Sequence, residues 1–276
     1  MIDYHLHSDN SGDATDTVVA ICRTAVDRGL TEICFTEHVD FEPTDSCYGT
    51  FDYARYAFEI ESAREVFAGR LTIALGAEVD YQARFHSQIR DFFDGKKLDY
   101  VLGAAHYVDG MILEDHQRYF PGKTAEEAYA PYFDNTLAAV ETGWFDALAH
   151  LDVCKRYGVR YFGAFDEGPH RERVDDILKS VVKHDMTLEV NTSGLRQSPE
   201  DTYPGEDVVS RYHALDGRNI TVCSDAHRIE DVGMGLAKAV GIVQDAGFES
   251  VDTYHDRRRR KIMIADLLEL RVTSDG

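Results

Sequence analysis

The chain has 276 residues, of which 43% are hydrophobic, which is enough to bury a substantial core, and we expect one domain over residues 1–276. Its formal net charge of -21 argues against binding to nucleic acid or to an anionic membrane, because both would repel so acidic a surface. A small-molecule partner is therefore expected. The N-terminus lacks the segments of a secretory signal and no apolar run approaches the roughly 18 to 20 residues that span a bilayer, so we expect a cytoplasmic protein.

Seven short apolar runs alternate with stretches that have a helical pattern. In the first of these stretches, one helical face carries Val18, Ile21, Cys22, Ala25 and Val26, and Gly29 is placed to end the helix. This regular alternation, without long linkers, predicts a parallel sheet, open or closed into a barrel. The predicted strands are IDYHL at 2–6, EICFTEH at 32–38, LTIALGAE at 71–78, DYVLGAAH at 99–106, FDALAH at 145–150, MTLEVN at 186–191 and NITVCSDAH at 219–227.

A barrel is favoured because polar residues with ligand chemistry end each of these runs. In a βα barrel the carboxyl ends of all strands open on one face, so residues far apart in the sequence converge there. The residues are His7, Glu37 with His38, Glu78, His106, His150, Asn191, and Asp225 with His227.

Two features near the C-terminus are not expected to belong to a functional site. The basic stretch RRRRK at 257–261 is typical of a solvated helix end or an edge strand rather than of a binding patch. The last residues, TSDG, are expected to fray.

The five cysteines are scattered along the chain and show no C-x-x-C spacing. This argues against both a disulfide framework and a thiolate zinc site. We expect reduced thiols, most of them packed in the core: Cys22, Cys34, Cys47, Cys154 and Cys223.

Histidines and carboxylates at the strand ends predict a metal site. His5 and His7 point the same way from one strand, but such a pair also occurs on solvated strands and is weak evidence alone. Six of the twelve histidines lie at or just past predicted strand ends, together with three carboxylates, which is too many ligands for one ion and about right for two or three. The predicted ligands are His5, His7, Asp13, His38, Glu78, His106, His150, Asp225 and His227.

The predicted ligand atoms are nitrogen and oxygen, which suits zinc, manganese or iron, and Glu78 is the natural bridging carboxylate. Such a cluster provides what hydrolysis of a phosphate monoester needs, namely a nucleophilic water and neutralisation of the phosphoryl oxygens. Arg196 and Arg156 follow strand ends and are candidate phosphate clamps, because a guanidinium pairs with phosphate through two parallel hydrogen bonds. Ordinary surface arginines are the alternative.

Six dispersed motifs resemble, in order, those of the PHP family, named for polymerase and histidinol phosphatase. They are D-x-H-x-H at 3–7, T-E-H at 36–38, G-A-E at 76–78, A-H at 105–106, A-H-L-D at 149–152 and S-D-A-H at 224–227. Within that family, E-V-N-T-S-G-L-R at 189–196, and Asp13 where many relatives have a third N-terminal histidine, resemble the histidinol-phosphate phosphatases.

The resemblance implies a distorted (βα)7 barrel with a trinuclear metal site at the carboxyl ends of the strands. It implies hydrolysis of L-histidinol phosphate in histidine biosynthesis, by a metal-bridging hydroxide held by Glu78. Because Asp13 provides an oxygen ligand, which shifts preference toward harder ions, the identity and occupancy of the third metal stay open. The implied sets are His5, His7, Glu78 and Asp225; Glu78, His106 and His150; and Asp13, His38 and His227, with Arg156 and Arg196 on the phosphate.

Three alternatives remain at this point. One is the same chemistry on another small phosphoester, such as a nucleotide or a sugar phosphate. A second is a binuclear amidohydrolase, which the T-E-H and S-D-A-H motifs fit poorly. A third is a non-catalytic metal-binding protein on the same scaffold. Four residues are candidates for binding the histidinol part of the substrate, by their position alone: Tyr48, Tyr107, Asp109 and His116.

Overall fold

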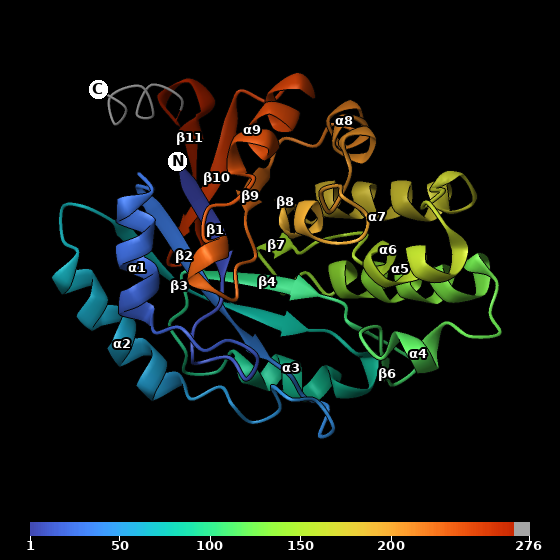
Figure 1. Ribbon diagram of the computed structural model, residues 1–276, viewed down its shortest axis with the longest axis horizontal. Coiled ribbons are helices and arrows are strands. Elements are labelled where there is room, and N and C mark those ends of the chain that lie inside the picture. The colour runs from blue at the N-terminus through green and yellow to red at the C-terminus, as the bar shows by residue number, and fades with distance from the viewer. Residues whose placement is uncertain (268–276) are drawn as a thin grey trace.

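The computed structural model describes residues 1–267, and at its centre lies a seven-stranded parallel sheet (Figure 1). Neighbouring strands follow the order β1-β2-β3-β4-β7-β8-β9, so sequential strands of the sheet lie side by side. All seven predicted strands are confirmed. Their bounds are β1 (Ile2–Leu6), β2 (Glu32–Val39), β3 (Thr72–Asp80), β4 (Tyr100–Ala104), β7 (Ala147–Leu148), β8 (Thr187–Asn191) and β9 (Ile220–Cys223).

The sheet nearly closes into a barrel where β1 meets the chain after β9. Leu6 forms a parallel bridge with Ala226, whose carbonyl oxygen accepts a hydrogen bond from the His7 amide at 3.0 Å. The Asp225 amide donates to the carbonyl oxygen of His5 at 2.9 Å. The predicted single-domain, distorted seven-stranded barrel is thus confirmed, and its strands all end at one face.

Helices connect the strands and cover the barrel, with α1 and α2 at the left of Figure 1 and α5, α6 and α7 at its right. Helix α1 buries four of the five residues of the predicted apolar face, and Val26 is only partly buried. Gly29 follows the helix with φ of 72°. The helices are α1 (Val18–Asp27), α2 (Tyr53–Val66), α3 (His86–Phe92), α4 (His116–Tyr119), α5 (Ala125–Glu141), α6 (Cys154–Phe162), α7 (Arg171–Lys183), α8 (Glu206–Ala214) and α9 (Leu236–Asp245).

Two antiparallel pairs stand outside the barrel: β5 (Tyr107–Val108) with β6 (Met111–Ile112), and β10 (Ser250–His255) with β11 (Arg258–Met263). The basic stretch at 257–261 forms the turn before β11 and the first residues of that strand. The prediction of an edge strand is therefore confirmed, and the alternative of a helix end is wrong.

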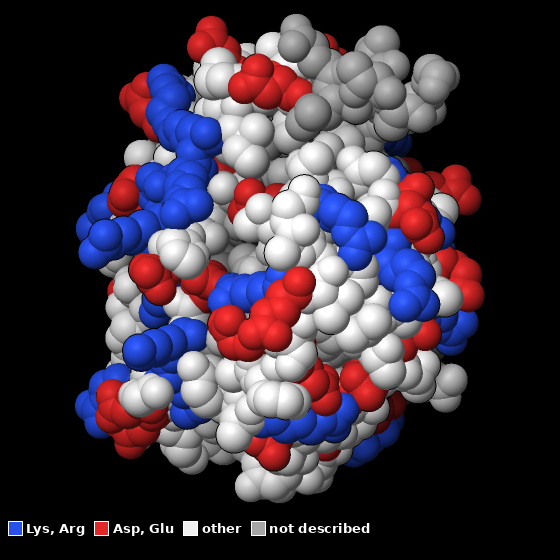
Figure 2. Space-filling view, turned by 90° about the vertical axis from the view of Figure 1, so that its left-hand side faces the viewer, with Lys and Arg blue, Asp and Glu red and all other residues white. Residues whose placement is uncertain are grey.

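Alternate basic side chains of β11 are paired with acids: Arg259 with Asp185 at 3.1 Å, and Lys261 with Asp252 at 3.0 Å. Figure 2 shows Lys and Arg side chains on both sides and across the lower part of its face, with acidic side chains interspersed among them. The basic residues of this acidic chain are thus mixed with carboxylates on that face.

The residues expected to fray, TSDG, lie outside the described residues, as does the end of the predicted domain. None of the helices within residues 1–267 combines the length and the apolar character needed to cross a membrane.

Candidate metal centre

The nine predicted ligand residues meet at the carboxyl face of the barrel. They come from the ends of β1, β2 and β3 and from the segments that follow β1, β4, β7 and β9. His5 and His7 are fully buried, and the other seven line a cavity of about 500 Å³. The barrel thus brings together residues that lie up to 222 positions apart, from His5 to His227.

One set of ligand atoms surrounds the buried pair His5 and His7. Their Nε2 atoms are 2.9 Å apart, and each lies near Oε2 of Glu78, at 3.2 Å and 3.5 Å. Oδ1 of Asp225 lies 3.7 Å and 3.6 Å from the same two nitrogens. These four side chains form the first of the three sets that the resemblance implies.

A second set uses the other oxygen of Glu78. Its Oε1 lies 2.8 Å from Nε2 of His150 and 3.5 Å from Nε2 of His106, and these two nitrogens are 3.3 Å apart. Because each carboxylate oxygen faces a different set, Glu78 is placed to bridge two ions.

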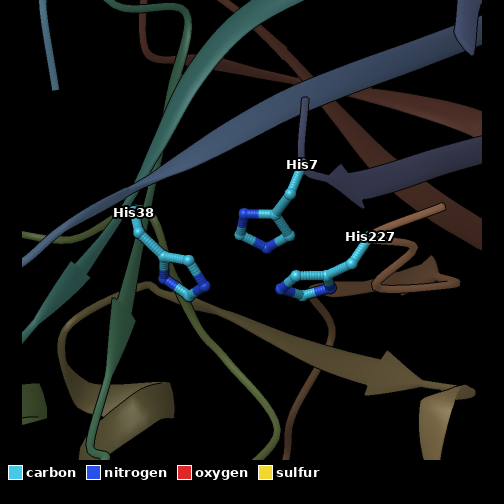
Figure 3. Close-up of side chains that lie close together, drawn as sticks. All are labelled: His7, His38 and His227. Carbon is cyan, nitrogen blue, oxygen red and sulfur yellow. The ribbon is translucent and has the colours of Figure 1, made fainter. Parts of the chain in front are cut away.

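A third set lies nearer the solvent. Oδ2 of Asp13 is 3.4 Å from Nε2 of His38 and 3.1 Å from Nε2 of His227. Figure 3 shows His38 and His227 grouped with His7, and the ring centroid of His7 lies 4.3 Å and 4.2 Å from theirs. Asp13 is 39% exposed, so this third set opens to the cavity mouth.

The residues present fit divalent cations by their chemistry. Within residues 1–267, the ion pairs of Asp13, Glu78 and Asp225 are all to imidazole nitrogens, with no Lys or Arg among them. Protonating every histidine would pack like charges together, while leaving all of them neutral would leave three carboxylates without counter-charge. Cations held between nitrogen and oxygen donors remove this conflict.

Two ligand residues have pKa values shifted toward the state that binds metal, whereas neighbouring carboxylates raise the pKa of four other ligand histidines and favour their protonated forms: His5, His38, His106 and His227. Burial lowers the pKa of His7, and His227, His38 and His5 lower it further, so its imidazole is neutral. Burial opposes ionisation of Glu78, but His5 and His38 hold the pKa of its carboxyl well below its usual range. A neutral imidazole and an ionised carboxylate are the forms that coordinate.

Buried carboxylates also orient the histidines from behind. Oε1 of Glu189 lies 2.8 Å from Nδ1 of His5, and Oε2 of Glu189 accepts a hydrogen bond from the His150 amide at 2.9 Å. Oδ1 of Asp80 accepts from the His106 amide at 2.8 Å. With Nδ1 of His5 engaged in this way, Nε2 of its ring faces Glu78.

Two predicted ligand residues have unusual backbone conformations. Asp225 has φ of 53° and His150 has φ of 20°, in or at the edge of the left-handed region that residues other than glycine rarely adopt. Such strain persists where surrounding contacts hold it, typically at functional sites.

Both predicted phosphate-clamp arginines line the cavity, and Arg228, which directly follows His227, lines it too. Arg196 is anchored by two of its nitrogens: Nη2 donates to the carbonyl oxygen of Ser224 at 2.9 Å, and Nε pairs with Asp231 at 3.2 Å. Its third nitrogen, Nη1, is buried and has no hydrogen-bond partner within residues 1–267. A buried guanidinium nitrogen without a partner is costly, and an anion in the cavity could satisfy it.

Sequence reasoning missed other side chains of the cavity wall. Strand alternation could have found Asp40, which lies two residues beyond His38. Cys47 and Glu114 lie in connecting segments with no periodic signal. None of the four candidates for the histidinol end lines this cavity within the described residues: Tyr48, Tyr107, Asp109 and His116. The hydroxyl of Tyr107 instead donates a hydrogen bond to Asp45, and Asp45 lines the cavity.

Comparison with known proteins identifies the family of the chain. A family model described as PHP domain matches residues 3–193. The histidinol-phosphatase of Lactococcus lactis is 28% identical over 92% of this chain and 94% of that protein, and a probable histidinol-phosphatase of Deinococcus radiodurans is 31% identical over 92% and 97%. The crystal structure of the Lactococcus lactis histidinol phosphate phosphatase, complexed with zinc, L-histidinol and phosphate, matches with a TM-score of 0.87, 28% identity and coverage of 94% and 98%. The chain therefore belongs to the PHP domain family.

Proposed function

We propose that this chain is a metal-dependent phosphomonoesterase that hydrolyses L-histidinol phosphate to L-histidinol and phosphate. The observation that carries the proposal is the grouping of nine candidate ligand side chains, seven of which line a cavity. Arg196 lines the same cavity, and its Nη1 has no hydrogen-bond partner within residues 1–267. The similar Lactococcus lactis protein, complexed with zinc, L-histidinol and phosphate, supports the choice of substrate.

We further propose that two or three ions of zinc, manganese or iron occupy the three sets. His5, His7, Glu78 and Asp225 would hold the first ion, and the shared Glu78 would join it to the second. Bound ions would supply an activated water and offset the charge of the phosphoryl oxygens. The sets are His5, His7, Glu78 and Asp225; Glu78, His106 and His150; and Asp13, His38 and His227.

The arginines of the cavity would hold the phosphate. Arg196 is already oriented by Ser224 and Asp231, so its free Nη1 can bind a phosphate oxygen without first ordering the side chain. Arg156 lies on the same cavity wall and would add a second guanidinium.

The charges of the cavity favour a substrate that has a cationic end. Carboxylates line it as well as arginines, among them Asp40, Asp45 and Glu114. L-Histidinol phosphate carries an amine in addition to its phosphate, whereas a sugar phosphate or a nucleoside monophosphate has no such cation. For this reason, hydrolysis of another small phosphoester is the second candidate function.

A substrate panel tests the proposal. The zinc- or manganese-loaded protein is expected to release phosphate from L-histidinol phosphate with kcat/KM about 10² or more above that for nucleoside monophosphates, sugar phosphates and 4-nitrophenyl phosphate. Equal rates on nucleotides would contradict the substrate assignment alone. No release from any of them by metal-loaded protein would favour a non-catalytic metal-binding role. The cytoplasmic location and the lack of nucleic-acid partners stay predictions.

A further inference from the structure

The loop between β2 and α2 brings a thiol to the third set of ligand atoms. Sγ of Cys47 lies within 4.8 Å of ligand atoms of Asp13 and His38, which lie equally close to each other. Cys47 is 4% exposed and lines the cavity. Donor atoms around one ion are separated by at most about twice the metal–ligand distance of 2.0 to 2.3 Å, about 4.6 Å. The 4.8 Å bound on this spacing is within a few tenths of an ångström of that limit, so a small side-chain adjustment suffices for a shared ion.

The backbone of this loop is held firmly in place. The Cys47 amide donates to Oδ1 of Asp45 at 2.7 Å, and Oγ1 of Thr50 donates to the Cys47 carbonyl oxygen at 2.8 Å. The sulfur is therefore presented to the set by an ordered loop.

The segment that carries Asp13 is shaped to receive this loop. A Cβ atom at Gly12 would lie 2.6 Å from the carbonyl oxygen of Ser46 and 3.2 Å from Cα of Cys47. Any residue other than glycine at position 12 would therefore push the loop away from the site. The close approach of Cys47 to Asp13 thus depends on a glycine one residue before that carboxylate.

Among the described residues, the sulfur makes one weak polar contact. Its contact with Oγ of Ser46, at 4.0 Å, is long for a hydrogen bond. Burial raises the pKa of the Cys47 thiol to about 11, so without a cation the sulfur keeps its proton. A metal ion that binds a cysteine displaces this proton to the solvent and takes the thiolate as ligand.

We propose that Cys47 is a thiolate ligand of the ion held by Asp13, His38 and His227. The inference rests on the proposed function, since it places the thiolate on one ion of that cluster. The site then offers two nitrogens, one oxygen and one sulfur, a four-donor set that suits tetrahedral zinc. The soft sulfur offsets the preference for harder ions that Asp13 would introduce, so this site would select zinc over manganese.

Substitution with cobalt(II) tests the proposal, because a thiolate bound to cobalt gives an intense charge-transfer absorption in the near ultraviolet that oxygen and nitrogen ligands do not give. We expect this band in the cobalt-loaded protein and its loss in both Cys47→Ala and Cys47→Ser. Either variant should also weaken zinc binding at one site by at least about tenfold, the lower bound for loss of an outer partner of a metal ligand.

Cys223→Ala is the matched control, because Cys223 is also buried and lies within 4.8 Å of ligand atoms of His5 and Glu189. The band is expected to survive in this variant. Bound cobalt without the band, or a band that persists in a folded Cys47→Ala variant, would overturn the role of Cys47 and leave the proposed function intact. A parent chain that binds neither cobalt, zinc nor manganese would instead contradict the proposed function itself.

Discussion

The two ends of the barrel hold their buried carboxylates in opposite ways. At the amino end, Asp99 pairs with Arg64 at 2.5 Å just before β4, and Asp146 pairs with Arg257 at 2.8 Å just before β7. At the carboxyl end, Glu78 has five histidines within 3.5 Å and no Lys or Arg within residues 1–267. Arginines of the chain thus balance Asp99 and Asp146, whereas no Lys or Arg within residues 1–267 balances Glu78.

This difference separates stability from function. Carboxylates matched by arginines and backbone amides tie strands, helices and loops together and leave nothing for a ligand to do. Carboxylates matched only by imidazoles, in a cavity, leave room for cations from outside. The predictions below test this division from its largest expected effect to its smallest.

Among the substitutions at the carboxyl end of the barrel, Glu78→Gln is expected to lower activity most. The amide keeps the size of the side chain but removes the charge that joins two of the three sets. We expect phosphate release from L-histidinol phosphate to fall by about 10³ or more, beyond what one lost electrostatic donor typically costs. Metal analysis of the same sample should show fewer bound ions, and full activity with full metal content would contradict the bridging role.

Arg196→Ala removes the preoriented guanidinium and leaves the ligand sets in place. We expect kcat/KM for L-histidinol phosphate to fall by about 10², with weaker inhibition by inorganic phosphate and unchanged metal content. Arg90→Ala on α3, where the side chain is 63% exposed, is the control and should change neither. Unaltered kcat/KM in Arg196→Ala would mean that this arginine does not bind the phosphate.

Asp99→Asn weakens the amino end without touching the cavity. The Asp99 carboxylate accepts hydrogen bonds from the amides of Leu75 and Asp256 in addition to its pair with Arg64. Burial opposes ionisation, but these hydrogen bonds and Arg64 outweigh it and lower the pKa of Asp99. We expect the variant to lose about 1.5 to 3 kcal/mol of unfolding free energy at pH 7, with unchanged activity per folded molecule.

The pH dependence of that loss has a definite sign. Because the folded pKa lies below the unfolded value of about 3.9, the stabilisation is present above that pH and is lost as the pH falls through the folded pKa. Urea unfolding at pH 7 and at pH 3 should therefore show the two proteins converge in acid. The control variant Asp94→Asn, at an exposed position, should keep an unfolding free energy within about 0.5 kcal/mol of the parent. A loss in Asp94→Asn equal to that in Asp99→Asn would contradict the stabilising role of Asp99.

The barrel, and the convergence of most of the nine candidate ligand residues at one face, could be predicted from the sequence because both follow from local patterns. Each barrel strand is an apolar run, and a residue at its carboxyl end lies on the active face of any such barrel. His38 and His106 needed no further information to be placed together.

What the sequence left open depends on contacts between distant segments. Cys47 reaches the site only because its loop packs on Gly12, and nothing in the stretch TDSCYG signals that approach. The identity of β11 was ambiguous because its stabilising partners, Asp185 and Asp252, are brought to Arg259 and Lys261 by the fold. Backbone conformations such as that of Asp225 likewise have no sequence signature.

The central claim is that the carboxyl end of the barrel is completed by metal ions. The most direct measurement is phosphate release from L-histidinol phosphate as zinc is added back to chelator-treated protein. We predict no activity in the metal-free protein and a rise that saturates at two to three zinc ions per chain. Full activity in folded, metal-free protein would contradict the claim.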